Sequence, residues 1–386
     1  MRSTVPTRAW VRVVAGATLL DLAVSPLFAW SVFADDLAGR LHVAETALAS
    51  VFSIGLGSFA AGVLLAGPIA DRVAPRWLAL VTAALAGAGL LGSGLAPSVA
   101  ALVAAFGLGL GASTGLGYAT AVRAAGTVDR RRGLALAIAV SAYAGGTIAV
   151  APAAAALLGA IGPSATLAVL AAATAAVLLA AAALLPGRLQ HRRPAHSAER
   201  VHLGRAELGL GAAFALGSAP GLAAFAHAGD VLGRPGGAAV AVLLLSVGNF
   251  AGRLIAGPAS DRVGRPVALH TNEALLVGTS AALLLPAPDG VRLVLLLVLG
   301  LQYGALSVLV PAALGDSVPA ARFGASYGVV FSGWGIAGLA APVAAAALSV
   351  SAGWRATFLA FGAAGVAAWV AIGRLPGGSS ARRPTR

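Results

Sequence analysis

Cysteine and lysine are both absent from this chain, and charged residues of any kind are scarce. The absence of cysteine excludes disulfide bonds, thiolate metal sites and thiol nucleophiles. Charged residues make up only 10% of the sequence, whereas soluble domains contain roughly 25%. This low charge excludes an ordinary soluble fold.

Apolar residues form 59% of the chain, and the mean hydropathy is +0.91. A run of about 20 apolar residues crosses a bilayer core about 30 Å thick. The sequence divides into twelve such runs, at residues 13–33, 46–70, 78–95, 98–120, 134–158, 164–186, 206–226, 238–258, 267–286, 290–313, 326–348 and 353–373. We therefore predict an all-α integral membrane protein. The first run is longer than a signal peptide and has no convincing cleavage site, so we expect it to be retained.

The chain also contains an internal repeat. Gly67–Val73 reads Gly-Pro-Ile-Ala-Asp-Arg-Val, and Gly257–Val263, 190 residues later, reads Gly-Pro-Ala-Ser-Asp-Arg-Val. The same offset matches Arg132 to Arg322, Gly145 to Gly335 and Pro152 to Pro342. The repeat predicts two pseudo-symmetric six-helix bundles, residues 1–186 and 206–386, joined by a basic cytoplasmic linker at 187–205 and ending in a short basic tail.

The arginines predict the orientation. With both termini in the cytoplasm, 21 arginines lie on the cytoplasmic side, and only Arg40, Arg234, Arg292 and Arg355 lie opposite. This asymmetry predicts a multi-pass protein of the cytoplasmic (inner) membrane with both ends inside. The net charge of +13 is spread over short loops and not gathered on one face, so we exclude nucleic acid as a partner.

A short charged sequence pattern follows the second and eighth spans. The pattern Gly-x-x-x-Asp-Arg-x-Gly-Arg is complete in the second copy, at Gly257, Asp261, Arg262, Gly264 and Arg265. The first copy has Gly67, Asp71 and Arg72, but Ala74 and Pro75 replace the final Gly-Arg. Together with the twelve spans and the basic central loop, this pattern resembles the major facilitator superfamily over the whole chain. The resemblance implies a gating motif that holds the outward-facing state without touching substrate; the alternative is that these charges only mark topology.

Arg253 is the only arginine more than one helical turn from the end of a predicted span. A charge there is costly and usually faces a cavity. Its guanidinium could bind a carboxylate through two hydrogen bonds, and Asn249, one turn earlier, could add a donor on the same face. The alternative is that Arg253 snorkels toward the cytoplasmic turn, about 12 Å away.

Two acids also lie at least one helical turn inside predicted spans. Asp21 is a candidate for proton coupling, because a carboxylate buried alone in a membrane takes up a proton. The alternative is that it neutralises an arginine near a helix end. Glu273 lies only one or two turns into its span, so we predict an ion pair at the cytoplasmic end.

A narrower resemblance involves the first, eighth and eleventh spans. Phe28–Phe33 and Gly252-Arg253-Leu254 are similar to the oxalate/formate antiporter and monocarboxylate transporter branch, which implies that Arg253 binds the substrate carboxylate. Tyr327-Gly328 and Gly333-Trp334-Gly335 resemble the eleventh-span pattern, in which lysine commonly takes the place of Trp334. One cation instead of two favours a monocarboxylate over oxalate. Asn249 stands where proton-coupled relatives tend to have an acid.

Aromatic side chains inside the spans could complete the pocket: Phe28, Trp30, Tyr118, Tyr143, Tyr303, Tyr327 and Trp334. The alternative is that they anchor the protein at the bilayer surface or pack between helices. We also predict helix breaks at Pro26 and at Gly217–Gly221, because transporter gates often use interrupted helices.

These features predict a secondary active transporter, working as a monomer, that moves a small organic anion by alternating access. The favoured substrate is a monocarboxylate, carried by proton symport or by exchange (antiport). The alternatives are efflux of a neutral or hydrophobic compound and, less favoured, a non-transporting receptor. We expect no enzymatic activity, cofactor or metal, because the intramembrane residues provide no acid, base and nucleophile cluster and the histidines lack ligand spacing.

Overall fold

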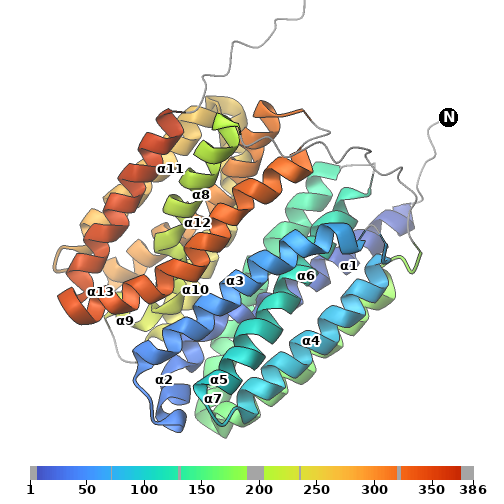
Figure 1. Cartoon of the computed structure of the whole chain (residues 1–386), viewed down its shortest axis with the longest axis horizontal. Coiled ribbons are helices and arrows are strands. Elements are labelled where there is room, and N and C mark those ends of the chain that lie inside the picture. The colour runs from blue at the N-terminus through green and yellow to red at the C-terminus, as the bar shows by residue number, and fades with distance from the viewer. Residues whose placement is uncertain are drawn as a thin grey trace, which may run out of the picture.

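The computed structural model describes residues 7–70, 72–128, 132–188, 204–233, 236–319 and 323–374. Within these ranges every regular element is helical (Figure 1). The first half contains α1 (Thr7–Ala23), η1 (Ser25–Ala29), α2 (Trp30–Leu41), α3 (Glu45–Ala70), α4 (Pro75–Leu95), α5 (Val99–Leu102), η2 (Val103–Leu110), α6 (Gly111–Gly126) and α7 (Arg132–Leu184). The second half contains α8 (Arg205–Ala226), α9 (Ala228–Leu232), α10 (Ala238–Val263), α11 (Arg265–Leu283), α12 (Asp289–Ser317) and α13 (Phe323–Gly373).

Two of these helices cross the membrane twice. α7 has 53 residues and α13 has 51, so a straight helix of either length would span roughly 77–80 Å, far more than a bilayer. Each is interrupted at a glycine in the left-handed region, Gly162 at φ 74° and Gly353 at φ 80°, a conformation that glycine adopts without steric cost. Figure 1 shows α13 turning back on itself.

The described residues therefore make twelve passes. Nine segments are long and apolar enough to cross a membrane, and two of them are the doubled helices α7 and α13. The remaining pass is α11, which is more polar than the other spans because it carries His270, Asn272 and Glu273. The predicted fold of twelve helices in two six-helix bundles is confirmed.

Glycine brings corresponding helices together in each half. A Cβ atom on Gly115 of α6 would overlap the Phe59 carbonyl of α3, and one on Gly304 of α12 would overlap the Asn249 carbonyl of α10. Such close backbone approach is typical of membrane helices, where small residues allow tight packing. The two halves meet where α3 packs on α13 and α7 packs on α10, and Figure 1 shows α3 and α13 side by side.

The two predicted helix breaks have different outcomes. The break at Pro26 is confirmed, because η1 separates α1 from α2 there. The break at Gly217–Gly221 is wrong, because α8 continues as one helix with Pro220 inside it. These glycines serve packing instead: a Cβ on Gly217 would lie 2.7 Å from Glu273 Oε1, and one on Gly221 would lie 2.9 Å from the Tyr303 Cβ.

Candidate functional site

A small cavity of about 30 Å³ lies between the two halves. The first half lines it with Phe28 of η1, Phe59 of α3, Tyr118 of α6 and Tyr143 of α7. The second half contributes Phe214 of α8, Asn249 and Arg253 of α10, Tyr303 and Ser307 of α12, and Tyr327, Phe331 and Trp334 of α13. We call this the central cavity. Nine of its twelve lining residues are aromatic, and they include all four tyrosines of the chain.

The central cavity brings together eight of the nine residues that the sequence suggested for substrate binding: Arg253, Asn249, Tyr303, Trp334, Phe28, Tyr118, Tyr143 and Tyr327. Trp30 lies elsewhere. Its ring packs on Phe106 with centroids 4.7 Å apart, inside the first half. Residues two apart on a helix point about 200° apart, so Phe28 and Trp30 face different sides of the first span.

Sequence reasoning missed four lining residues: Phe59, Phe214, Ser307 and Phe331. Helical spacing contained the signal for two of them. Ser307 lies four residues after Tyr303, and Phe331 lies four residues after Tyr327, so each shares a helix face with a residue that was identified. Phe59 occupies the position that matches Asn249 in the 190-residue repeat.

Arg253 bridges the two halves of the protein. Its Nε donates a hydrogen bond to Asn249 Oδ1 at 2.9 Å, and its Nη1 donates to the Val140 carbonyl of α7 at 2.8 Å. On α10, Asn249 lies one helical turn before Arg253 and is therefore further from Asp261, near the end of the helix. Because the guanidinium binds Asn249, it points toward the middle of the membrane. This geometry differs from the snorkelling alternative, and it makes Asn249 a positioning partner of the arginine.

Asp21 lies close to this arginine without forming an ion pair with it. Its side chain on α1 is fully buried, and its charge interacts with that of Arg253. Oδ2 accepts a hydrogen bond from the Tyr143 backbone N–H at 3.2 Å, while Oδ1 has no partner among the described residues. One acid from the first half thus lies near one base from the second.

The hydroxyl groups of Tyr303 and Ser307, which line the central cavity, are hydrogen-bonded within the protein. Trp334 Nε1 donates to the Tyr303 hydroxyl at 3.0 Å, and Ser307 Oγ donates to the Tyr303 carbonyl at 3.0 Å. The Tyr143 hydroxyl is the exception: it is buried and has no partner among the described residues. It is therefore free to bond a molecule held in the cavity.

Glu273 does not form the ion pair that we predicted. Its side chain is fully buried in the second half, where Asn272 Nδ2 donates to Oε1 at 3.3 Å. Among the described residues it has no cationic partner within ion-pair distance. The prediction failed because α11 turns this side chain inward against Gly217 of α8 and not toward the arginines of the cytoplasmic loops.

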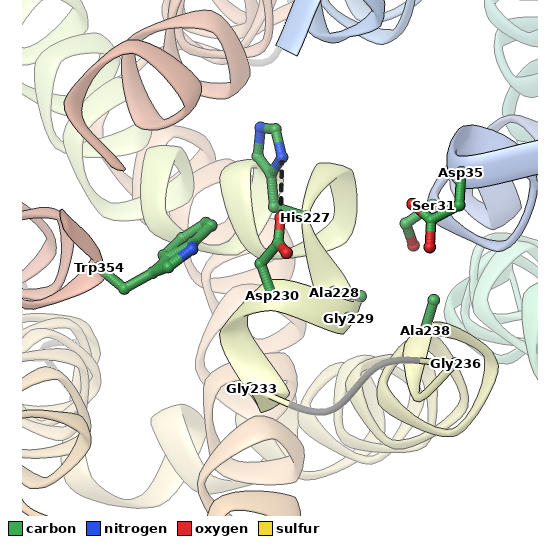
Figure 2. Close-up of a pocket in the computed structure, with 10 residues that line it drawn as sticks. All are labelled: Ser31, Asp35, His227, Ala228, Gly229, Asp230, Gly233, Gly236, Ala238 and Trp354. Atoms are coloured by element: carbon green, nitrogen blue, oxygen red, sulfur yellow. Dashed lines mark ion pairs between the residues drawn. The ribbon is translucent and has the colours of Figure 1, made fainter. Parts of the chain in front are cut away.

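A second, larger hollow of about 380 Å³ lies near α9 (Figure 2). Ser31 and Asp35 of α2 line one side, facing His227, Asp230 and Trp354 of the second half. We call it the vestibule. Ser31 is three residues, or one helical turn, beyond Phe28, so about 5 Å of helix separates the two linings. The vestibule thus lies next to the central cavity along the first span.

Two titratable groups of the vestibule have shifted pKa values. Burial lowers the pKa of His227, although the Pro342 carbonyl and Asp230 oppose the shift. Burial raises the pKa of Asp230, and nearby Asp35 acts in the same direction. His227 Nε2 donates to the Pro342 carbonyl at 3.0 Å, and its Nδ1 lies 3.8 Å from Asp230 Oδ2. The charge of a protonated His227 acts in the opposite direction and lowers the pKa of Asp230.

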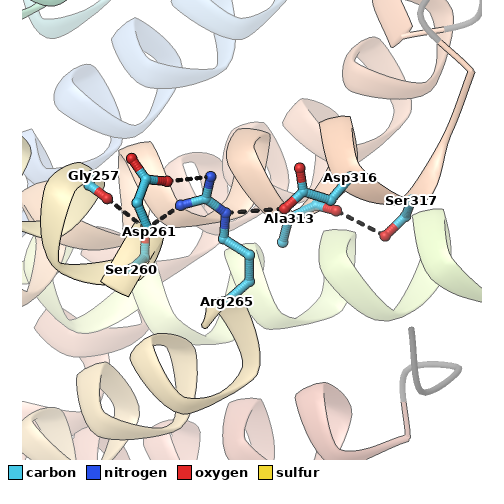
Figure 3. A network of polar contacts seen from close by, with 7 residues as sticks. All are labelled: Gly257, Ser260, Asp261, Arg265, Ala313, Asp316 and Ser317. Atoms are coloured by element: carbon cyan, nitrogen blue, oxygen red, sulfur yellow. Dashed lines mark hydrogen bonds and ion pairs between the residues drawn. The ribbon is translucent and has the colours of Figure 1, made fainter. Parts of the chain in front are cut away.

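The complete copy of the signature motif forms a polar clasp (Figure 3). Arg265 Nη2 lies 2.7 Å from Asp261 Oδ1, Nε donates to Asp316 Oδ2 at 3.0 Å, and Nη1 contacts Ser260 Oγ. The clasp joins α10, α11 and α12, so it lies within the second half and does not cross to the first.

The remaining motif residues have separate places. Gly264 takes φ 89° and ends α10, whereas Arg262 is exposed. Gly257 supplies a carbonyl that accepts from Ser260 Oγ at 2.8 Å. In the first copy, Gly67 belongs to α3 and Arg72 is exposed, while Asp71 lies outside the described residues.

Two bundles of membrane helices around a shared central cavity define a membrane transporter. The sequence pattern of the Major Facilitator Superfamily matches residues 14–300 and 208–385, and the chain belongs to this superfamily. A search of curated proteins finds no match. Among solved structures, a mutant of the nucleoside transporter NupG superposes with a TM-score of 0.71 over 94% of this chain and 99% of its own, at 15% identity. That identity establishes a shared fold and nothing about substrate.

Proposed function

We propose that this transporter carries a small monocarboxylate through the central cavity by alternating access. The observation that carries the proposal is Arg253, a single guanidinium at a cavity formed by both halves. A guanidinium has five N–H donors, and the two hydrogen bonds to Asn249 and Val140 occupy two of them. The remaining donors suit a carboxylate, which accepts two parallel hydrogen bonds from such a fork.

The bond from Arg253 to Val140 links substrate binding to movement of the halves. It joins α10 to α7, so separating the halves there breaks it, and a hydrogen bond to a charged group contributes about 1.5–3 kcal/mol. A substrate carboxylate offsets this loss by accepting the freed donor. The cavity of about 30 Å³ holds one or two waters, so an organic substrate enters only when the lining side chains or the halves move apart.

Asp21 gives this site a route to proton coupling. Its carboxylate and a substrate carboxylate compete for the same positive charge, since Asp21 interacts with Arg253. Protonation of Asp21 removes the competitor and leaves the guanidinium to the substrate, which is the linkage that proton symport requires. Exchange of one carboxylate for another needs no such proton and remains the alternative coupling.

The arginine asymmetry supports placement in the cytoplasmic membrane with both termini inside. We also propose that the protein works as a monomer, with halves bounded at 1–186 and 206–386. In that orientation the clasp at Arg265 lies at the cytoplasmic end. The vestibule then opens to the opposite side, since α9 follows the far end of α8.

The test is uptake of labelled lactate, pyruvate, formate and oxalate into proteoliposomes at two imposed proton gradients. Wild type is compared with Arg253→Gln and with Arg374→Gln, an exposed arginine at the end of the chain's last described helix. Leaving a buried carboxylate without its charged partner costs about 2–5 kcal/mol, so we expect Arg253→Gln to lower uptake of a monocarboxylate by roughly 100-fold. The control retains wild-type uptake.

The aromatic lining favours one competing function, efflux of a neutral hydrophobic compound. A neutral substrate gains nothing from the guanidinium. If Arg253→Gln moves substrate as fast as wild type, or if correctly inserted protein moves no organic anion, the monocarboxylate proposal is wrong and efflux takes its place.

A further inference from the structure

Aromatic residues are concentrated around the central cavity to a degree that anion binding alone does not explain. The chain has 22 aromatic side chains, as six Trp, four Tyr and twelve Phe. Nine of these line one cavity, and they are drawn from seven helical elements in both halves. Phe28, Tyr143, Tyr303, Phe331 and Trp334 are at most 4% exposed. They therefore do not belong to an aromatic belt at the bilayer surface.

The rings form two groups, each of which crosses between the halves. In one group, Phe28 of the first half lies against Tyr303 of the second, with ring planes at 30° to each other and centroids 6.4 Å apart. In the other, Phe59 of the first half meets Trp334 of the second edge to face at 5.0 Å, and Trp334 stacks on Phe331 at 5.1 Å. Tyr143 touches both groups, through Phe28 at 5.4 Å and Phe59 at 6.0 Å.

These contacts close the cavity in the present conformation. When the halves move apart to admit a substrate, the contacts from Phe28 to Tyr303 and from Phe59 to Trp334 are lost. When an aliphatic acid occupies the opened cavity, the separated ring faces and edges have no aromatic group to contact. A planar aromatic substrate replaces them, because aromatic pairs are more favourable than their buried area alone provides.

A separate observation points to a bound molecule. The Tyr143 hydroxyl is buried, lines the cavity and lacks a partner among the described residues. A buried hydroxyl without a hydrogen bond is unfavourable. A polar group on a bound substrate would satisfy it.

We propose that the substrate is an aromatic monocarboxylate. Its carboxylate binds Arg253, and its ring lies between the Phe28–Tyr303 pair and the Phe59–Trp334–Phe331 group. This inference rests on the proposed function, because it assumes that Arg253 receives the carboxylate. It adds the class of substrate, which charge alone does not determine.

The test is counterflow of labelled benzoate in proteoliposomes, with three unlabelled competitors. Cyclohexanecarboxylate matches benzoate in charge and approximate size but has no π-system, lactate is a small aliphatic acid, and benzamide keeps the ring without the charge. We expect benzoate itself to compete at least about tenfold better than each of them, since aromatic contacts and the guanidinium both contribute.

Variants then test the aromatic rings. Trp334→Leu is expected to reduce the preference for benzoate over cyclohexanecarboxylate to about twofold or less, whereas Trp334→Phe keeps it, because a ring is retained. Trp77→Leu is the matched control, since Trp77 is 57% exposed on α4, away from the cavity. Elution of each variant as a single symmetric peak in detergent shows that it is folded.

The outcomes separate this inference from the proposed function. Counterflow of lactate that Arg253→Gln abolishes, with no preference for benzoate, overturns the aromatic substrate and keeps the monocarboxylate. Benzamide competing as well as benzoate, with Arg253→Gln unaffected, overturns the monocarboxylate itself. A preference for benzoate that survives Trp334→Leu also contradicts the inference.

Discussion

Helices α3 and α10 occupy matching places in the two halves, and their amino acids differ where they reach the central cavity. The sequence Gly-Pro-x-x-Asp-Arg-Val begins near the end of each helix. Asn249 and Arg253 on α10 correspond, 190 residues earlier, to Phe59 and Val63 on α3. The repeat thus preserves the frame of the protein, whereas the polar chemistry of the site belongs to α10.

The acid shows the opposite asymmetry. Asp21 belongs to the first half, and the matching position in the second half is Gly211. Under the proposed mechanism, one charge from each half couples binding to movement, because movement of the halves changes the distance between Asp21 and Arg253.

The largest effect on this asymmetry is expected from Asp21→Asn. Removing the acid removes the group that competes for Arg253, so the variant should lose accumulation against a gradient by at least about tenfold while counterflow continues. The measurement is accumulation of substrate in proteoliposomes under an imposed proton gradient. Asp289→Asn, an exposed aspartate on α12, is the control. Accumulation equal to wild type in Asp21→Asn would show that Asp21 does not couple protons.

A moderate effect is expected where the two copies of the motif differ. Arg265 contacts both Asp261 and Asp316, whereas the basic residue nearest the matching position, Arg76 on α4, is exposed. Ion pairs with exposed partners contribute about 0–1 kcal/mol each. Arg265→Gln should therefore lower the melting temperature in detergent by a few degrees, and Arg76→Gln should leave it unchanged. Equal shifts for the two variants would mean that the clasp does not stabilise the second half.

The smallest effect is expected in the vestibule, as a dependence of stability on pH. Burial raises the pKa of Asp230 above its ordinary value of 3.8. The folded protein therefore binds this proton more tightly than the unfolded chain, and stability falls as pH rises through the window above 3.8. Asp230→Asn removes the penalty, so its melting temperature relative to wild type should be higher at pH 7 than at pH 4. Its side chain is 42% exposed, which keeps the effect small.

The control for this pH dependence is Asp36→Asn, because Asp36 is exposed on the neighbouring α2. His227 and Asp35 also face Asp230 and must stay unchanged in the comparison. A difference between Asp230→Asn and wild type that is the same at both pH values would refute the burial of a charged Asp230 as its cause.

The sequence was a good guide to the membrane helices because hydrophobicity is read along the chain, without knowledge of neighbours. It was a poorer guide to helix faces. Trp30 lies two residues from Phe28 and faces a different side, and Glu273 faces the interior of its bundle in place of the predicted arginine. Both depend on how a helix is rotated against its neighbours, which residues distant in the sequence decide.

The sequence by itself determined the membrane class, the two halves and the two charges, Asp21 and Arg253, that the proposed mechanism uses. These properties follow from apolar runs, from a 190-residue repeat and from the scarcity of charge inside the spans. Only the tertiary structure decided that Arg253 reaches Val140, 113 residues away, and that nine aromatic rings meet at one cavity. The physical reason is close packing: glycines on α3, α6, α10 and α12 let the backbones approach, and that approach fixes the helix rotations that aim these side chains at one another.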